Sequence, residues 1–255
     1  MIDYKICIPS YKRPKIIREK TIAFLNRLQI PEESLDIIVE TEEMANEYKK
    51  HSPLPNYIVS NTNGIKEKRN FVRNYYQNET SIEYLICIDD DMEDIMDYDK
   101  PITRESFIDN LENAFNECIE KGLTLFGVSP FHNTFFLKHN TSTTLKYICG
   151  AFFGLIINRD YPPIQTTFDH YEDFCFTCQH FCRDSGTLRL NWLALKTKYF
   201  NPKGGITEWY GGKEARAEAQ ATDAERFMTL YPNMARIITK KYGVDLRLNH
   251  RFKNK

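Results

Sequence analysis

The chain is organised around the segment Ile86-Cys87-Ile88-Asp89-Asp90-Asp91-Met92. The apolar, branched residues over 84–88 predict a buried strand, and three carboxylates follow at its carboxyl end. Such close charges stay ionised together only when they are exposed, hydrogen-bonded or bound to a hard cation. In an extended segment Asp89 and Asp91 share one side, and Asp90 points the other way. The pattern predicts a two-carboxylate site for Mn²⁺ or Mg²⁺, with an acidic strand cap as the alternative.

Strands and helices alternate through the first half of the chain. Strands are expected at 4–9, 35–39, 57–59 and 84–88. Helices are expected to begin at Pro14, at Glu42 and directly after Gly64. This order predicts right-handed βαβ units and a mostly parallel sheet flanked by helices. Ligands bind outside the carboxyl ends of such strands. The loops Ser10-Tyr11, Glu40-Thr41 and Asp89-Asp90-Asp91 are therefore expected to face one crevice.

The second half is less regular. We expect helices over 103–121, from about Asp169 to Cys182 and over 213–228, with strands over 123–128 and 147–157. The glycine-rich segment 201–212 predicts a mobile loop, and 237–255 form a basic terminal segment. No domain boundary or repeat is apparent, so residues 1–255 are expected to form a single α/β domain.

Composition narrows the class of protein. A formal net charge of −1 over 255 residues excludes a bulk polycation, so any contact with nucleic acid needs a local basic patch. No apolar run is long enough to cross a bilayer, and no membrane partner is expected. Seven cysteines, an odd number, fit reduced thiols in a cytoplasm. Cys175, Cys178 and Cys182 would form one helix stripe, which favours buried thiols over a zinc site.

Three motifs together resemble the nucleotide-sugar half of GT-A-type glycosyltransferases. They are Ile8-Pro9-Ser10-Tyr11, Gly64 to Asn70, and Ile88-Asp89-Asp90-Asp91, in matching order and spacing. The resemblance implies a Rossmann-like GT-A fold with a mixed, mostly parallel sheet. Residues 1–98 would form the nucleotide-sugar half, and 99–255 would form the acceptor half.

The resemblance also implies a set of donor-binding residues for a UDP-sugar. Tyr11 and Glu40-Thr41 would hold the nucleobase, and Arg69 would face the diphosphate, with a solvated helix face as the alternative for Arg69. Asp89 and Asp91 would hold the metal. The full donor-binding set is Pro9, Tyr11, Arg13, Glu40, Thr41, Gly64, Lys68, Arg69, Asp89, Asp90, Gly150 and Lys203.

The second half of the chain carries the expected catalytic residues. Gly150 to Gly154 resembles the glycine-bearing acceptor loop of the family. Tyr171-Glu172-Asp173 resembles its xED motif, so Glu172 and Asp173 are expected in catalysis, with Asp173 as general base. The alternative for Asp173 is a carboxylate placed at a helix N-terminus by the macrodipole.

One family feature is missing. A histidine before a glycine pair often supplies a third metal ligand, but Asn201-Pro202-Lys203-Gly204-Gly205 has none. Three possibilities stay open: Lys203 neutralises the diphosphate, His250 reaches the metal from the C-terminus, or metal binding is weak.

The segment Cys7-Ile8-Pro9-Ser10-Tyr11-Lys12-Arg13-Pro14, with the basic C-terminus, most resembles the TET-associated DNA glycosyltransferases of bacteriophages, relatives of the base J glucosyltransferase. The resemblance implies transfer of a sugar to 5-hydroxymethyl-pyrimidines, such as hydroxymethylcytosine, in double-stranded DNA, in a host cytoplasm. The expected DNA contacts are Lys240, Lys241, Arg247 and Arg251. A solvated tail is the alternative for this segment. For the whole protein the alternatives are a polysaccharide or protein glycosyltransferase, and a non-catalytic nucleotide- or DNA-binding module.

Overall fold

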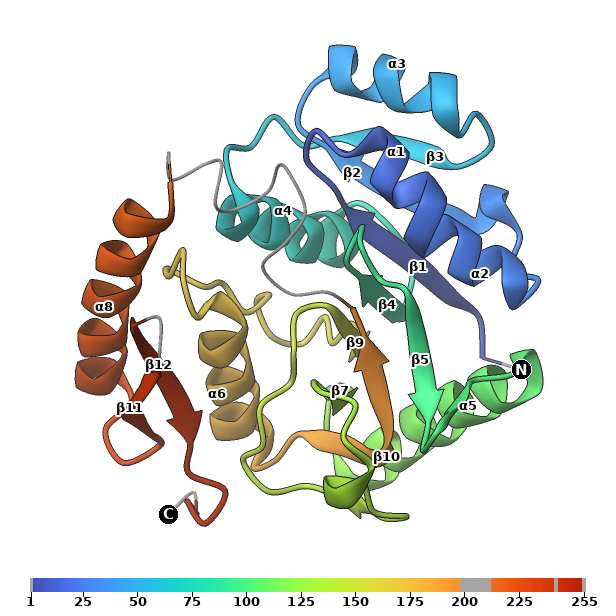
Figure 1. The fold of residues 1–255 in the computed structure, drawn as a ribbon. Coiled ribbons are helices and arrows are strands. Elements are labelled where there is room, and N and C mark those ends of the chain that lie inside the picture. Colours follow the sequence, from blue (N-terminus) through green and yellow to red (C-terminus); the bar gives the residue numbers. More distant parts are fainter. Residues whose placement is uncertain (1, 198–211, 241–242, 254–255) are drawn as a thin grey trace.

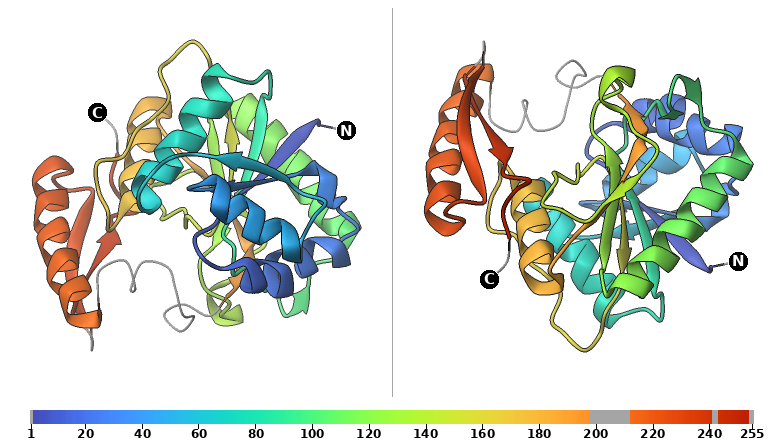
Figure 2. Two further views of the ribbon diagram at one scale, coloured as in Figure 1. Left: turned by 90° about the horizontal axis from the view of Figure 1, so that it is seen from above. Right: turned by 90° about the horizontal axis from the view of Figure 1, so that it is seen from below.

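The computed structural model describes residues 2–197, 212–240 and 243–253. A ten-stranded sheet forms the middle layer, and helices cover both of its faces (Figure 1). Helix α8 (Lys213–Leu230) and a two-stranded sheet lie at one end of the molecule, beyond helix α6 (Glu172–Asp184) (Figures 1 and 2). Helix α3 (Glu42–His51) lies toward the opposite end.

The large sheet is mixed. Its order is β3 (Asn56–Val59), β2 (Leu35–Val39), β1 (Tyr4–Pro9), β4 (Tyr84–Ile88), β9 (Phe152–Ile156), β7 (Leu125–Ser129), β10 (Leu188–Lys196), β5 (Asp94–Asp97) and β6 (Lys100–Pro101), with β8 (Thr141–Ser142) also on β10. Strands β3, β2, β1 and β4 are parallel, and β7 is parallel to β10. Strand β9 runs antiparallel between β4 and β7. The predicted mixed, largely parallel α/β sheet is confirmed.

Helices form where the periodicity predicts them. They include α1 (Pro14–Ile17), which continues through the π-helical turn η1 (Arg18–Ile22) into α2 (Ala23–Arg27), then α4 (Ile65–Asn78) and α5 (Arg104–Lys121). Short 3₁₀ turns are η2 (Glu32–Ser34) and η3 (Thr134–Phe136). Pro14 stands in the first turn, where no amide donor is needed, and Thr103 caps α5 by accepting from Ser106 N.

Side chains of alternate strand residues build two separate cores. Ile6 and Ile8 of β1 face the core that includes residues of α2 and α5. Cys7 of β1 and Cys87 of β4 face the other core, with Val72 of α4. Because every second residue of a strand points to the opposite face, one apolar strand can supply both layers.

The C-terminal segment is a packed element. Strands β11 (Ala235–Lys240) and β12 (Gly243–Leu248) form an antiparallel hairpin. Phe227 of α8 and Leu246 of β12 share a core with Cys175 and Cys178 of α6. The alternative of a solvated tail is therefore wrong for residues 235–240 and 243–248, because Ala235, Leu246 and Leu248 on their inward face are buried.

Two expectations from composition are tested by the fold. No disulfide joins the seven cysteines, all of which lie in the described part of the chain. Cys175 and Cys178 are buried as predicted, whereas Cys182 at the end of the stripe is exposed.

Within residues 2–197, 212–240 and 243–253, no three His, Cys, Asp or Glu side chains are grouped to hold a metal ion. No helix in the described residues is long and apolar enough to span a bilayer.

A buried polar cluster fastens the end of α6 to the start of β7. His180 Nδ1 lies 2.8 Å from Thr124 Oγ1, and the backbone amide of Thr124 donates to Asp184 at 3.2 Å. Burial lowers the pKa of His180 to about 4. The imidazole is therefore neutral in the folded protein over a range where an unfolded chain would bind a proton.

This cluster predicts a pH-dependent stability. Between about pH 6.5 and pH 4 the unfolded chain binds a proton that folded His180 does not, so the free energy of unfolding falls as the pH falls. The expected loss from this group is ~2–3 kcal/mol. Urea unfolding of the wild type and His180→Gln near neutral pH and near pH 4.5 measures it. The same pH dependence in both proteins would contradict the assignment.

Candidate active site

The acidic segment is fixed in place through its backbone. Asp89 N donates to Ala151 O at 3.0 Å, which joins the end of β4 to the start of β9. Thr21 Oγ1 in η1 donates to Asp89 O at 2.8 Å and accepts from Met92 N at 3.0 Å. The turn that carries the three carboxylates is therefore held from two sides.

The three carboxylates differ in exposure and in partners. Asp90 is 5% exposed and accepts from Ser10 Oγ at 2.5 Å. The side chains of Asp89 and Asp91 are 31% and 18% exposed. Arg13 Nη1 lies 2.9 Å from Asp90 Oδ1 and 3.3 Å from Asp91 Oδ2. Residues 90 and 91 form a turn, and the same Arg13 nitrogen contacts both of them, so Asp90 does not point away from Asp91 as the alternation of an extended segment predicted.

The predicted donor loops meet at the carboxyl ends of β1 and β2. Lys68 Nζ of α4 donates to Ser10 O at 2.7 Å and lies 3.4 Å from Glu40 Oε1. It also lies 5.3 Å from the centre of the Tyr11 ring. Gly64, at φ 87°, precedes α4, and its amide donates to the same Glu40 oxygen at 3.4 Å.

Thr41 of the predicted donor loop, and Tyr48 beside the loop after β1, have structural partners. Thr41 caps α3, because its hydroxyl accepts from Met44 N. Tyr48 OH lies 2.7 Å from Ser10 Oγ and accepts from Arg13 N at 2.8 Å. Tyr48 therefore positions the loop after β1, directly beyond Pro9, and sequence reasoning did not find it.

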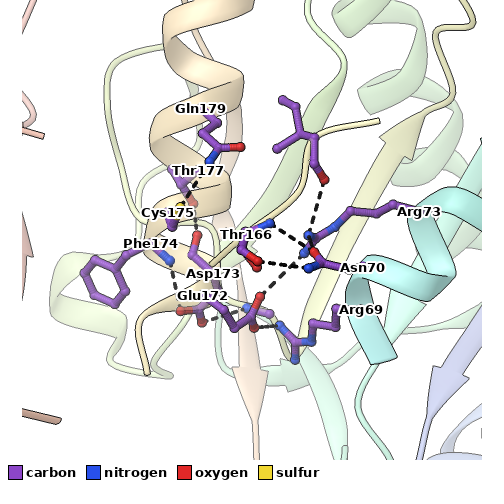
Figure 3. Close-up of polar contacts among 12 residues, drawn as sticks. Arg69, Asn70, Arg73, Thr166, Glu172, Asp173, Phe174, Cys175, Thr177 and Gln179 are labelled. Atoms are coloured by element: carbon purple, nitrogen blue, oxygen red, sulfur yellow. Dashed lines mark hydrogen bonds and ion pairs between the residues drawn. The ribbon is translucent and has the colours of Figure 1, made fainter. Parts of the chain in front are cut away.

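A buried ion-pair network joins α4 to α6 (Figure 3). Arg69 Nη1 donates to Glu172, and Arg69 Nη2 lies 2.9 Å from Asp89 Oδ1. Arg73, one turn further along α4, lies 3.5 Å from the other oxygen of Glu172. Glu172 is thus enclosed between two guanidinium groups and is 6% exposed. This geometry fits a positioning carboxylate better than one that contacts a substrate.

Asp173 lies beside this network at the start of α6 (Figure 3). It accepts from Gly150 N at 3.2 Å, from Phe174 N at 3.0 Å and from the hydroxyl of Tyr147. These donors leave the carboxylate half-buried in a fixed orientation. The structure therefore brings Asp173 and Gly150 together.

Gly150 stands where no side chain fits. A Cβ at this position would lie 1.7 Å from Arg69 Nη1. The backbone of the 147–151 segment can therefore pass directly beside the guanidinium group only because residue 150 is a glycine.

We expect Gly150→Ala to displace Arg69 from Asp89 and Glu172. Leaving Glu172 with a broken buried ion pair costs ~3–5 kcal/mol in the free energy of unfolding. Gly122→Ala is the matched control, because nothing lies within 4 Å of its Cβ and only its φ of 66° opposes alanine. That control substitution should lower the free energy of unfolding by only ~1–2 kcal/mol. Chemical denaturation measures the free energy of unfolding of the two variants. Equal losses of stability would mean that Arg69 moves aside freely.

The site carries more negative than positive charge. Its carboxylates are Glu40, Asp89, Asp90, Asp91, Glu172 and Asp173, and its cations are Arg13, Lys68, Arg69 and Arg73. If all ten of these groups are counted as ionised, two negative charges are left over. Burial raises the pKa of Asp89 to about 7, against the effect of Arg69, and burial also raises the pKa of Asp91. Hard oxygen donors with this residual charge fit a divalent cation.

The remaining predicted residues do not join this cluster. His250 is exposed in the turn after β12, and no contact in the described residues links it to Asp89 or Asp91. Lys203 and Lys241 lie outside the described residues, as does the predicted glycine-rich loop except for Gly212. Arg247 and Lys240 lie on the hairpin, where Lys240 forms an ion pair with Asp245.

Solved structures with the same architecture support a GT-A-type fold. TarS 1-349 from S. aureus in complex with UDP-GlcNAc is 17% identical, with a TM-score of 0.52 over 89% of this chain and 73% of that chain. The mannosyltransferase PcManGT from Pyrobaculum calidifontis, in complex with GDP-Man and Mn²⁺, is 12% identical, with a TM-score of 0.53 over 89% and 64%. Glucosyl-3-phosphoglycerate synthase from Mycobacterium tuberculosis, in complex with UDP, is 10% identical, with a TM-score of 0.52 over 97% and 87%.

No family model and no curated protein matches the sequence. At these identities the structural likeness shows the fold alone. The chain has the GT-A-type fold of nucleotide-diphospho-sugar glycosyltransferases.

Proposed function

We propose that this protein is a glycosyltransferase that uses a nucleotide-sugar donor. One observation carries the proposal: Asp89 and Asp91, Arg69 and Asp173 converge at the carboxyl edge of β4 on a GT-A-type fold. Each supplies a different part of sugar transfer, namely cation ligands, a positive charge for the diphosphate and a base. A non-catalytic binding module would need no oriented base such as Asp173.

Asp89 and Asp91 would hold Mn²⁺ or Mg²⁺ in the proposed enzyme. When bound, that cation supplies charge that stabilises the departing diphosphate. Arg69 adds a fixed guanidinium group beside it, and Glu172 with Arg73 keeps Arg69 from turning away. Tyr11, Lys68 and Glu40 form the side on which the nucleoside would lie.

Asp173 is the proposed general base. It takes the proton of the acceptor hydroxyl while that oxygen forms a bond to the anomeric carbon. The bond from the anomeric carbon to the diphosphate oxygen breaks, and its electron pair leaves with the nucleoside diphosphate. Direct displacement of this kind inverts the configuration at the anomeric carbon.

The proposed acceptor is a 5-hydroxymethyl-pyrimidine in double-stranded DNA. A 5-substituent already lies in the major groove, so its hydroxyl need not be reached by full base flipping. The hairpin supplies a local basic surface, because Arg236 and Arg247 are cross-strand partners and both are exposed. It lies beyond α6, at the end of the molecule away from α3 (Figure 1).

Removing the hairpin arginines should weaken DNA binding at every sequence. For Arg236→Ser with Arg247→Ser, the slope of log affinity against log salt should fall by about two, because two phosphate contacts are lost. Arg104→Ser with Lys121→Ser on α5 removes the same charge from another surface and should have a smaller effect. Filter binding across a salt series measures the slopes, and equal slopes in all three proteins exclude the hairpin as a DNA contact.

Mass spectrometry of nucleosides tests the acceptor. The protein is incubated with hydroxymethylcytosine duplex, Mn²⁺ and a panel of nucleotide-sugars, and the DNA is then digested. The expected product is a nucleoside heavier by one sugar residue. If nucleoside diphosphate is released but the DNA stays unmodified, the acceptor is wrong, and a polysaccharide or protein acceptor replaces it.

A further inference from the structure

Outside the site described above, Arg189 of β10 lies near Lys146 and Lys138 of the segment between β7 and β9. Arg189 and Asn191 lie on β10, with Arg189 opposite Gly127 of β7 and Ser142 of β8. Leu188 and Leu190 on either side of Arg189 point into the core beneath α5, so Arg189 points to the opposite face of the sheet. From the segment between β7 and β9, Lys146 Nζ donates to the side chain of Asn191, and the backbone amide of Lys138 donates to Asn191 O at 3.1 Å.

A buried asparagine organises these cations. Asn191 Oδ1 accepts from Arg189 Nε at 3.1 Å and from Lys146 Nζ at 3.0 Å. Its Nδ2 donates to Asn140 O at 3.0 Å and to Asn140 Oδ1 at 2.9 Å. The amide is therefore oriented with its oxygen toward the cations, and two positive groups share one neutral acceptor.

No carboxylate balances this charge among the described residues. The partly buried Arg189 and Lys146 and the exposed Lys138 form no ion pair there, whereas the buried Lys68 and Arg73 do. Burial lowers the pKa of Arg189 to about 10. Burial, then Arg189 and Lys138, lower the pKa of Lys146 to about 8. Arg73, in contrast, is more deeply buried and has Glu172 beside it. Like charges held together without a counter-charge reduce stability, and an anion bound between them would supply that counter-charge.

We propose that Arg189, Lys146 and Lys138 form an anion site for a phosphate group of the acceptor. The forked guanidinium and two ammonium groups match the several oxygens of a phosphate. Lys146 directly precedes Tyr147, whose hydroxyl holds Asp173. A phosphate bound here would therefore be linked through adjacent residues to the proposed base. The assignment to the acceptor rests on the proposed function, whereas the anion site itself does not.

Inorganic phosphate is the probe for the site itself. The NMR signal of the Arg189 Nε–H group is identified by its loss in Arg189→Gln, and it should shift during titration of the wild type with phosphate. Lys146→Gln should weaken the affinity reported by this signal at least ~10-fold. Arg104→Gln with Lys121→Gln on α5 should leave that affinity within about twofold. If phosphate does not shift the Arg189 signal, the proposed anion site is wrong.

Stability separates a binding role from a structural one. Because Arg189 has no carboxylate to leave behind, Arg189→Gln should leave the unfolding midpoint in phosphate-free buffer unchanged or raise it. Added phosphate should raise the midpoint of the wild type but not of Arg189→Gln. A large loss of stability without phosphate would show that Arg189 supports the fold, and the proposal would fail.

Binding of a hydroxymethylcytosine duplex tests whether the phosphate bound at this site belongs to DNA. If the acceptor is DNA, Lys146→Gln with Arg189→Gln should weaken duplex binding ~10-fold or more, and nucleotide-sugar binding should stay unchanged. If the double variant and the wild type bind the duplex equally, while phosphate still shifts the Arg189 signal of the wild type, the site takes free phosphate. Its assignment to a DNA acceptor is then wrong. Failure of the donor reaction alone would count against the proposed function and not against the anion site.

Discussion

Asp91→Asn is expected to abolish sugar transfer while the fold stays intact. The change removes one of the two partly exposed carboxylates at the end of β4 but almost no volume, and Asp90 still holds Arg13. Because burial raises the pKa of Asp91, its charge does not stabilise the fold, and the variant should unfold at the wild-type midpoint or above. Loss of a directed charge at a reacting centre typically lowers turnover ~10²–10³-fold.

Glu93→Gln is the matched control for this substitution. Glu93 lies two residues along and forms an ion pair with Lys20 at 3.1 Å, so its replacement removes the same charge from the same turn. It should keep more than about half of the wild-type rate. EDTA should reproduce the effect of Asp91→Asn on the wild type. Full activity of Asp91→Asn in the presence of EDTA would remove the proposed metal site.

Asp173→Asn should lower turnover and leave donor affinity nearly unchanged. A base acts on the acceptor proton, and positioned proton transfer is typically worth ~10²–10⁴-fold in rate. Asparagine retains an oxygen that can accept from Gly150 N and Tyr147, so the local geometry should persist. Steady-state rates with saturating donor, together with donor titration, separate the two effects.

Asp169→Asn is the control for the base. Asp169 precedes α6 and forms an ion pair with Lys66 at 3.0 Å, outside the Arg69 network. It should change the rate by less than about threefold. A similarly small change in Asp173→Asn would return Asp173 to the role of a carboxylate that caps a helix.

Local pattern was enough to predict the first half of the fold. The strand over 84–88 and the helix after Gly64 depend on apolar periodicity and on one glycine, which are properties of neighbouring residues. The donor loops could be placed together because the carboxyl ends of parallel strands share one edge. Asp89, Asp90 and Asp91 do lie at that edge, with Arg69 beside them.

The second half of the chain could be predicted less well, because its structure depends on contacts between residues far apart in the sequence. Arg69 and Glu172 are 103 residues apart, so the role of Glu172 as a buried partner could not be read from its motif. Strand β10 was missed because Asn191 and Trp192 interrupt the apolar alternation of Leu188–Lys196. The predicted strand over 147–157 is strand only at 152–156, because residues 147–151 turn beside Arg69. The hairpin was missed because its outward face is basic.

Donor binding tests the central claim most directly. Calorimetric titration with UDP-sugars and GDP-sugars in the presence of Mn²⁺ needs no knowledge of the acceptor. The structure predicts that at least one donor binds with a dissociation constant below ~1 mM. It also predicts that Asp91→Asn weakens this binding, whereas Asp173→Asn does not. If neither a nucleotide-sugar nor a nucleoside diphosphate binds the wild-type protein, the chain is not a nucleotide-sugar transferase.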